Sequence, residues 1–157
     1  MSKEIYTKSV IEKTFVLLTE ISPELMDKTE YIQHSLDESF HQAFARYVGG
    51  IGSAITKEEI EEITGVSKAS LYRYISLKDE TLPDTDTLIS LCVGLRLYYP
   101  RIEYLFSLAG KQLTAHSQKY RICKRYLLGC FYNKNMTVEA LNEELISHGL
   151  VPLRKEK

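Results

Sequence analysis

The sequence predicts an all-helical protein. Apolar residues recur at intervals of three or four along most of the chain, the spacing that lines one face of an α-helix. Glycine and proline, which interrupt helices, are scarce, with 8 and 4 among 157 residues. No set of segments shows the alternating pattern of half-buried strands. We therefore expect an all-α fold.

The composition is that of a globular protein, with 44% hydrophobic and 26% charged residues. The longest apolar run, at 15–18, is far shorter than the ~20 residues that cross a bilayer. The first residues show no apolar segment followed by a cleavage site, as a secretory signal would. We expect a cytoplasmic protein with no membrane partner.

Helix boundaries are marked by capping residues and glycines. Residues 1–21 favour helix only weakly over strand. Ser22-Pro23-Glu24 is typical of a helix start, with a helix reaching about Gln33. A further start follows at Ser35, and its apolar face continues until Gly49-Gly50, which we expect to end the helix. Further helices are predicted at 57–64, 68–76, 84–95 and 101–109, the last closed by Gly110.

The C-terminal part predicts a helical hairpin joined at 133–135 and stopped by Gly149 and Pro152. Its apolar seam either extends the core of the chain or makes a homodimer. The residues of that seam are Tyr120, Cys123, Leu127 and Cys130 on the first helix and Val138, Leu141 and Leu145 on the second.

Nothing in the sequence indicates catalysis, a metal or a cofactor. The three cysteines lack Cys-x-x-Cys spacing, and we interpret them as small buried hydrophobes in a reducing compartment. The four histidines lack metal-binding spacing. We find no nucleophile elbow, no paired carboxylates in an apolar setting and no phosphate-binding glycine loop. We therefore expect a protein that is not an enzyme. The cysteines are Cys92, Cys123 and Cys130.

The most informative stretch is 55–76. Thr56 and Glu59 have the spacing of a capping box, which begins a first helix. Gly65 is placed to end that helix in a left-handed conformation, and Ser67 is placed to cap a second helix. Two short helices with a turn of about three residues must cross steeply to share a core. The segment therefore predicts a helix-turn-helix.

These residues resemble the lambda-repressor-like (Cro/XRE) family. In that family a capped helix with the pattern of 55–60 leads through Gly-Val-Ser, here 65–67, to a recognition helix, here about 68–76. The similarity extends to a proline-initiated fourth helix at 82–95 and a fifth at 102–113, with 36–50 as the first. The resemblance implies a five-helix DNA-binding domain, with an N-terminal helical extension and a C-terminal helical hairpin. The implied domains are 1–35, 36–113 and 114–157.

The resemblance also implies a function, that of a sequence-specific DNA-binding transcriptional regulator. Its partner would be double-stranded DNA, and the second helix would lie in the major groove. Arg73 would contact guanine and Ala69 a thymine methyl. A homodimer would double the few contacts that one recognition helix can make. The residues expected to read bases are Lys68, Ala69, Tyr72 and Arg73, and those expected to hold phosphates are Thr56, Lys57, Ser67, Ser70 and Lys78.

Charge complicates this interpretation. Residues 55–80 hold 4 basic and 6 acidic residues, whereas residues 111–157 hold 9 basic and 4 acidic ones. Either the acids of the first helix face away from DNA, or the fold is retained without DNA binding. The alternative function is a helical interaction module for a protein partner, such as an antitoxin-like or adaptor subunit. Its supporting feature is an acidic face made of Glu58, Glu59, Glu61 and Glu62. A basic cluster further on could be a solvated helix face or an auxiliary contact to DNA, and consists of Lys119, Arg121, Lys124 and Arg125.

Overall fold

The computed structural model describes residues 38–51, 56–76, 78, 80–113 and 116–153. Across these ranges the chain forms helices and no strand, which confirms the predicted all-α fold. The predicted helix at 22–33 and the rest of segment 1–35 lie outside the described residues. The helices are α3 (Phe40–Ile51), α4 (Lys57–Thr64), α5 (Lys68–Ile75), α6 (Thr85–Gly94), α7 (Tyr99–Leu108), α8 (Gln118–Gly129) and α9 (Val138–Ser147).

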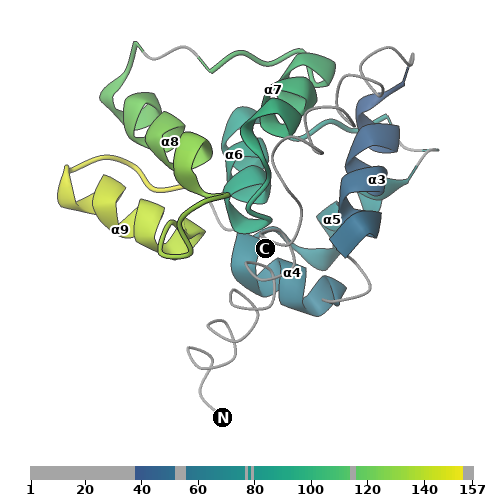
Figure 1. Ribbon diagram of the computed structural model, residues 1–157, viewed down its shortest axis with the longest axis horizontal. Coiled ribbons are helices and arrows are strands. Elements are labelled where there is room, and N and C mark those ends of the chain that lie inside the picture. The colour runs from purple at the N-terminus through teal and green to yellow at the C-terminus, as the bar shows by residue number, and fades with distance from the viewer. Residues whose placement is uncertain (1–37, 52–55, 77, 79, 114–115, 154–157) are drawn as a thin grey trace.

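Helix α6 lies at the centre of the molecule (Figure 1). Every residue from Thr87 to Gly94 is buried, so the helix is enclosed on all sides rather than amphipathic. Helices α8 and α9 pack on one side of it, and α4 packs near its C-terminal end. Helix α3 lies across from the hairpin and contacts α5 and α7. One hydrophobic core therefore connects all of these helices.

Helix α3 departs from its predicted boundaries at both ends. The predicted start at Ser35 lies outside the described residues, but Glu38 and Ser39 are not helical. Ser39 caps the helix instead: its N–H donates to Gln42 Oε1 at 2.8 Å, and the Gln42 N–H donates to Ser39 Oγ at 3.2 Å. The prediction that Gly49-Gly50 ends the helix was wrong, because α3 continues to Ile51. A glycine within a helix costs only about 1 kcal/mol, which tertiary contacts can offset.

The other predicted glycine stops are confirmed. Gly65, Gly110 and Gly149 follow α4, α7 and the last turn of α9 with φ values of 74°, 67° and 71°. This left-handed conformation is inexpensive only for glycine. Helix α7 begins earlier than predicted because Pro100 occupies its first turn, where a missing N–H costs nothing.

The seam of the C-terminal hairpin is enclosed by the chain's own core. Cys123, Leu127, Cys130, Leu141 and Leu145 are almost fully buried, in the same hydrophobic cluster as α6. The hairpin thus extends the core, the first of the two predicted alternatives, because its seam is buried within one chain. The interpretation of the three cysteines as buried free thiols is confirmed. None of the described helices is long and apolar enough to span a membrane.

Candidate nucleic-acid interface

Helices α4 and α5 have the capping residues that the sequence predicts. The Glu59 N–H donates to Thr56 Oγ1 at 3.1 Å, and the Thr56 N–H donates to the Glu59 carboxylate at 3.4 Å. After the left-handed Gly65, Ser67 caps α5 by accepting from the Ser70 N–H at 3.2 Å. The two helices are therefore joined by the short turn 65–67, with both starts fixed by local hydrogen bonds.

Thr64 fixes the turn between these helices. Its buried hydroxyl donates to the carbonyl oxygen of Ile60 at 2.7 Å and accepts from the Val66 N–H at 3.1 Å. Its methyl group lies against α6, where a Cβ added to Gly94 would approach Thr64 Cγ2 to 2.6 Å. Thr64 thus sets both the turn and the spacing between α4 and α6. Sequence analysis missed this role, although a threonine directly before a helix-ending glycine is a usable signal.

Helix α5 has one buried and one exposed face. Leu71 and Tyr74 are buried in the core, whereas Ala69, Tyr72 and Arg73 are exposed. Helix α3 holds the end of α5, since His41 Nδ1 donates to the carbonyl oxygen of Tyr74 at 2.9 Å. Three of the four residues that we expected to read bases are therefore exposed, and the fourth, Lys68, is half-buried.

Two glutamates of α4 engage Lys68 at the start of α5. The Lys68 Nζ lies 2.5 Å from Glu58 Oε1, and the Lys68 N–H donates to Glu61 Oε2 at 2.7 Å. The Glu58 contact raises the pKa of Lys68, and the Lys68 contact lowers the pKa of Glu58. The charge of Lys68 is therefore compensated in the free protein. Sequence analysis placed Glu61 on an acidic face but missed that it accepts a hydrogen bond at the start of α5.

The burial of Ser70 does not fit the phosphate contact that we predicted for it. Its side chain is only 2% exposed and lies between the Ser67 hydroxyl, at 3.0 Å, and Arg73 Nη2, which donates to Ser70 Oγ at 2.8 Å. A buried hydroxyl cannot reach a DNA phosphate without movement of the helix. Its contacts instead orient Arg73 on the exposed face.

Half-buried Lys57 and exposed Tyr72 form a second pair on this surface. The Lys57 Nζ lies 4.2 Å from the centre of the Tyr72 ring, within the range of a cation–π interaction. Tyr72 is 49% exposed although it is a large aromatic side chain. Lys78 is exposed beyond the end of α5, and its N–H donates to Ser76 Oγ at 3.3 Å. The other residues that we expected to contact DNA lie on or next to α4 and α5, whereas Lys78 lies in the segment after them.

The predicted acidic face of α4 is smaller than expected. Glu59 is buried at 9% exposure, because its carboxylate belongs to the capping box. Glu58 and Glu61 are exposed, and both contact Lys68. Glu62 is half-buried, so two of the four acids that we predicted to form this face are fully exposed.

Two of the four residues in the basic cluster of α8 pair with acids. The Lys119 Nζ lies 2.8 Å from Asp86 Oδ2, and Arg125 forms an ion pair with Glu144. Arg121 donates to the carbonyl oxygen of His116 at 3.4 Å. These contacts favour a solvated helix face over an auxiliary site for phosphate.

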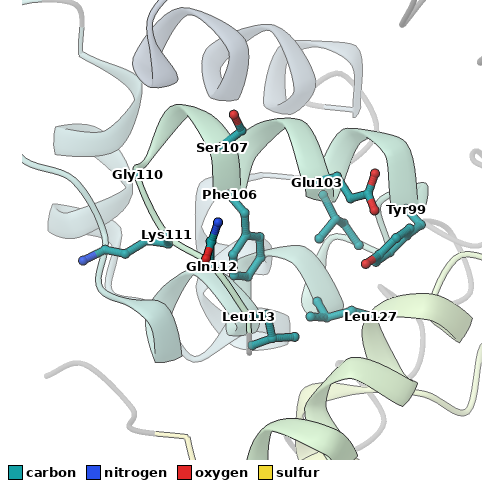
Figure 2. A pocket seen from close by; sticks show the side chains of 10 residues that line it. Tyr99, Glu103, Phe106, Ser107, Gly110, Lys111, Gln112, Leu113 and Leu127 are labelled. Carbon is teal, nitrogen blue, oxygen red and sulfur yellow. The ribbon is translucent and has the colours of Figure 1, made fainter. Parts of the chain in front are cut away.

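A hollow of about 700 Å³ lies between α7, the segment after it and α8. Figure 2 shows Phe106, Leu113 and Leu127 projecting toward its centre, whereas the side chains of Ser107 and Lys111 extend away from it. Ligand sites of this size orient their ligand with polar groups that converge on it. Tyr99, Glu103 and Gln112 also line the hollow, but the lining does not identify a ligand, and we assign the hollow no function. In the part of the chain that the structure describes, no three His, Cys, Asp or Glu residues are grouped to hold a metal ion.

Comparison with protein-family models, with curated proteins and with solved structures finds no match. The case for a function therefore depends on the surface of α4 and α5.

Proposed function

We propose that this chain is a sequence-specific DNA-binding transcriptional regulator, in which α4 and α5 form a lambda-repressor-like helix-turn-helix. The observation that carries the proposal is how α5 is capped, packed against the core and exposed. It is a short helix capped at its start, held to the core by Leu71 and Tyr74, with Ala69, Tyr72 and Arg73 exposed on its other face. A rigidly held helix with an exposed arginine is suited to the major groove.

Arg73 is the residue that would contribute most to base recognition. A guanidinium has five N–H donors, so the single hydrogen bond to Ser70 leaves enough of them for a bidentate contact to guanine. Because Ser70 is buried, it would hold Arg73 in one direction before DNA arrives. Ala69 would lie against a thymine methyl.

Phosphate contacts would come from the edges of the same surface. Thr56, Lys57, Ser67 and Lys78 lie at helix starts or just after α5, where contacts fix register without specifying sequence. So few cations would give a weak dependence on salt. A homodimer on a two-fold DNA site would double the contacts, and its interface would lie outside the buried hairpin seam.

The test is a fluorescence-anisotropy titration on duplexes selected from a random library, each compared with a scrambled duplex. We expect saturable binding and a preference for the selected duplex. The Arg73→Ala variant should lose roughly 10- to 100-fold of that preference, the equivalent of ~1–3 kcal/mol for one bidentate contact. Lys134→Ala is the matched control, because it removes one exposed positive charge from the hairpin loop. The proposal is wrong if the wild-type protein shows no saturable binding at low salt.

The alternative function is a helical interaction module for a protein partner, such as an antitoxin-like or adaptor subunit. The engagement of Lys68 by Glu58 and Glu61 favours it, because this part of the surface carries no excess positive charge. Purification from the native host separates the two functions. A stoichiometric protein partner without enrichment of DNA would favour the interaction module.

A further inference from the structure

The start of α5 is held by carboxylates at the place where the proposed function puts DNA. Glu61 accepts from the Lys68 N–H at 2.7 Å, and Glu58 lies 2.5 Å from the Lys68 ammonium. A free N–H group at a helix start and a free lysine are the groups that most readily bind a phosphate of any sequence. Here both groups of Lys68 are already satisfied by the protein.

We propose that Glu58 and Glu61 are specificity-determining residues, which clamp Lys68 and thereby suppress binding to DNA phosphates without regard to sequence. This inference rests on the proposed function. Non-specific binding is mostly the attraction between cations and phosphates, so a clamped lysine removes one such contact. Recognition by Arg73 is kept, because Arg73 is held by Ser70 and not by an acid.

The geometry separates the two glutamates by role. Glu58 contacts the side chain of Lys68, so it controls whether that charge is available. Glu61 contacts the backbone and places a negative charge at the positive end of the helix dipole. It therefore stabilises α5 and also repels an approaching phosphate. Glutamine at either position keeps an oxygen that accepts a hydrogen bond and removes only the charge.

The experiment measures affinity for selected and scrambled duplexes, at several salt concentrations, for the wild type, Glu58→Gln and Glu61→Gln. Both variants should bind scrambled DNA several-fold more tightly, with a smaller gain on the selected duplex, so that the specificity ratio falls. In Glu58→Gln the slope of log K against log salt should steepen by about 0.9, the value for one added phosphate contact. Glu143→Gln, which removes an exposed acid from α9, is the control for net charge and should leave the ratio unchanged.

A second background tests whether Lys68 carries the effect. In Lys68→Gln, the added change Glu58→Gln should have no further effect on the salt slope, because the lysine that it releases is gone. The clamp would be overturned, and the proposed function left standing, by the following result. The wild type binds the selected duplex, but the specificity ratio and the salt slope are the same in Glu58→Gln and Glu61→Gln as in the wild type. Failure of every protein to bind any duplex at low salt would overturn both.

An independent readout needs no DNA. The pKa of Glu58, followed by NMR, should lie below its ordinary value in the wild type, because the Lys68 ammonium lies beside it. It should return toward that value in Lys68→Gln. A pKa that is the same in both proteins would show that the two side chains are not paired in solution and would contradict the clamp.

Discussion

The guanidinium of Arg96 donates from Nη1 to the carbonyl oxygen of Lys134 at 3.3 Å, which ties the turn after α6 to the loop of the C-terminal hairpin. The same nitrogen donates to the carbonyl oxygen of Met136 at 3.4 Å. Arg96 is only 1% exposed, and burial lowers the pKa of its guanidinium. An arginine remains charged in proteins even so, and these carbonyl contacts compensate part of the cost of burying it.

Loss of the Arg96 side chain should destabilise the protein. We expect Arg96→Ala to lower the free energy of unfolding by about 2–4 kcal/mol, through lost hydrogen bonds and a buried gap. Arg96 also has a left-handed backbone, with a φ of 56°. Arg96→Gly loses the same contacts but removes the strain of a Cβ there, so it should be more stable than Arg96→Ala by about 1 kcal/mol. Urea denaturation measures the free energy of unfolding of both variants. If Arg96→Ala were the more stable of the two, the argument from backbone strain at position 96 would be contradicted.

Gly94 should not tolerate a side chain. A Cβ at this position would lie 2.6 Å from Thr64 Cγ2 and 2.9 Å from the carbonyl oxygen of Ile63. We expect Gly94→Ala to lower the free energy of unfolding by about 1–3 kcal/mol, because a backbone atom cannot move aside as a side chain can. The control is Gly49→Ala in α3, where a Cβ meets nothing within 4 Å. Alanine there should raise stability by about 0.5–1 kcal/mol. Equal thermal midpoints for the two variants would refute the close approach of α4 and α6.

The parts of the fold that could be predicted from the sequence are those that neighbouring residues determine. Thr56, Ser67 and Asp84 each cap a helix by accepting from the N–H three residues on. Gly65 lies where a left-handed residue must end α4. These signals are local, so they were visible without any knowledge of the tertiary structure. The outward face of α5 was predictable for the same reason, from helical periodicity.

The parts that could not be predicted depend on residues far apart in the chain. The continuation of α3 through Gly49 reflects tertiary contacts that outweigh a weak local preference. The burial of Arg96 depends on a loop about 40 positions away. The same holds within the candidate site, where Glu58 reaches Lys68 across the turn, ten residues on. Such contacts become visible only when α4 and α5 have been placed against each other.

The Thr64 hydroxyl should be needed for the turn before α5. In Thr64→Val the shape is kept, but the Val66 N–H loses its acceptor at 3.1 Å. Because Val66 is buried, we expect a loss of about 1–3 kcal/mol, the cost of an unsatisfied buried donor. Thr64→Ser keeps the hydroxyl and should lose only about 1 kcal/mol, for one methyl group. Chemical denaturation compares the two, and a serine variant less stable than the valine variant would show that the methyl contact to α6 matters more.

The buried thiols should make the protein less stable at alkaline pH. Burial raises the pKa of Cys123 and that of Cys130 from 9.0 to about 12. Between these values the folded state keeps protons that the unfolded chain releases, so the free energy of unfolding falls as pH rises. The slope is up to about 1.4 kcal/mol per pH unit for each thiol, and the thiols add no pH dependence well below pH 9.

Urea denaturation of the wild type and of Cys123→Ala, at neutral pH and in steps through the alkaline range, measures this effect. The variant should be less stable at neutral pH, because it leaves a small gap in the core, but its stability should decline less steeply above pH 9. Groups away from Cys123 that titrate in this range cancel in the comparison, whereas Tyr120, whose pKa is raised mainly by burial and in lesser part by Cys123, should shift slightly in the variant. Parallel curves for the two proteins would mean that the Cys123 thiol ionises as readily in the fold as in the unfolded chain, contrary to its burial between α8 and the core.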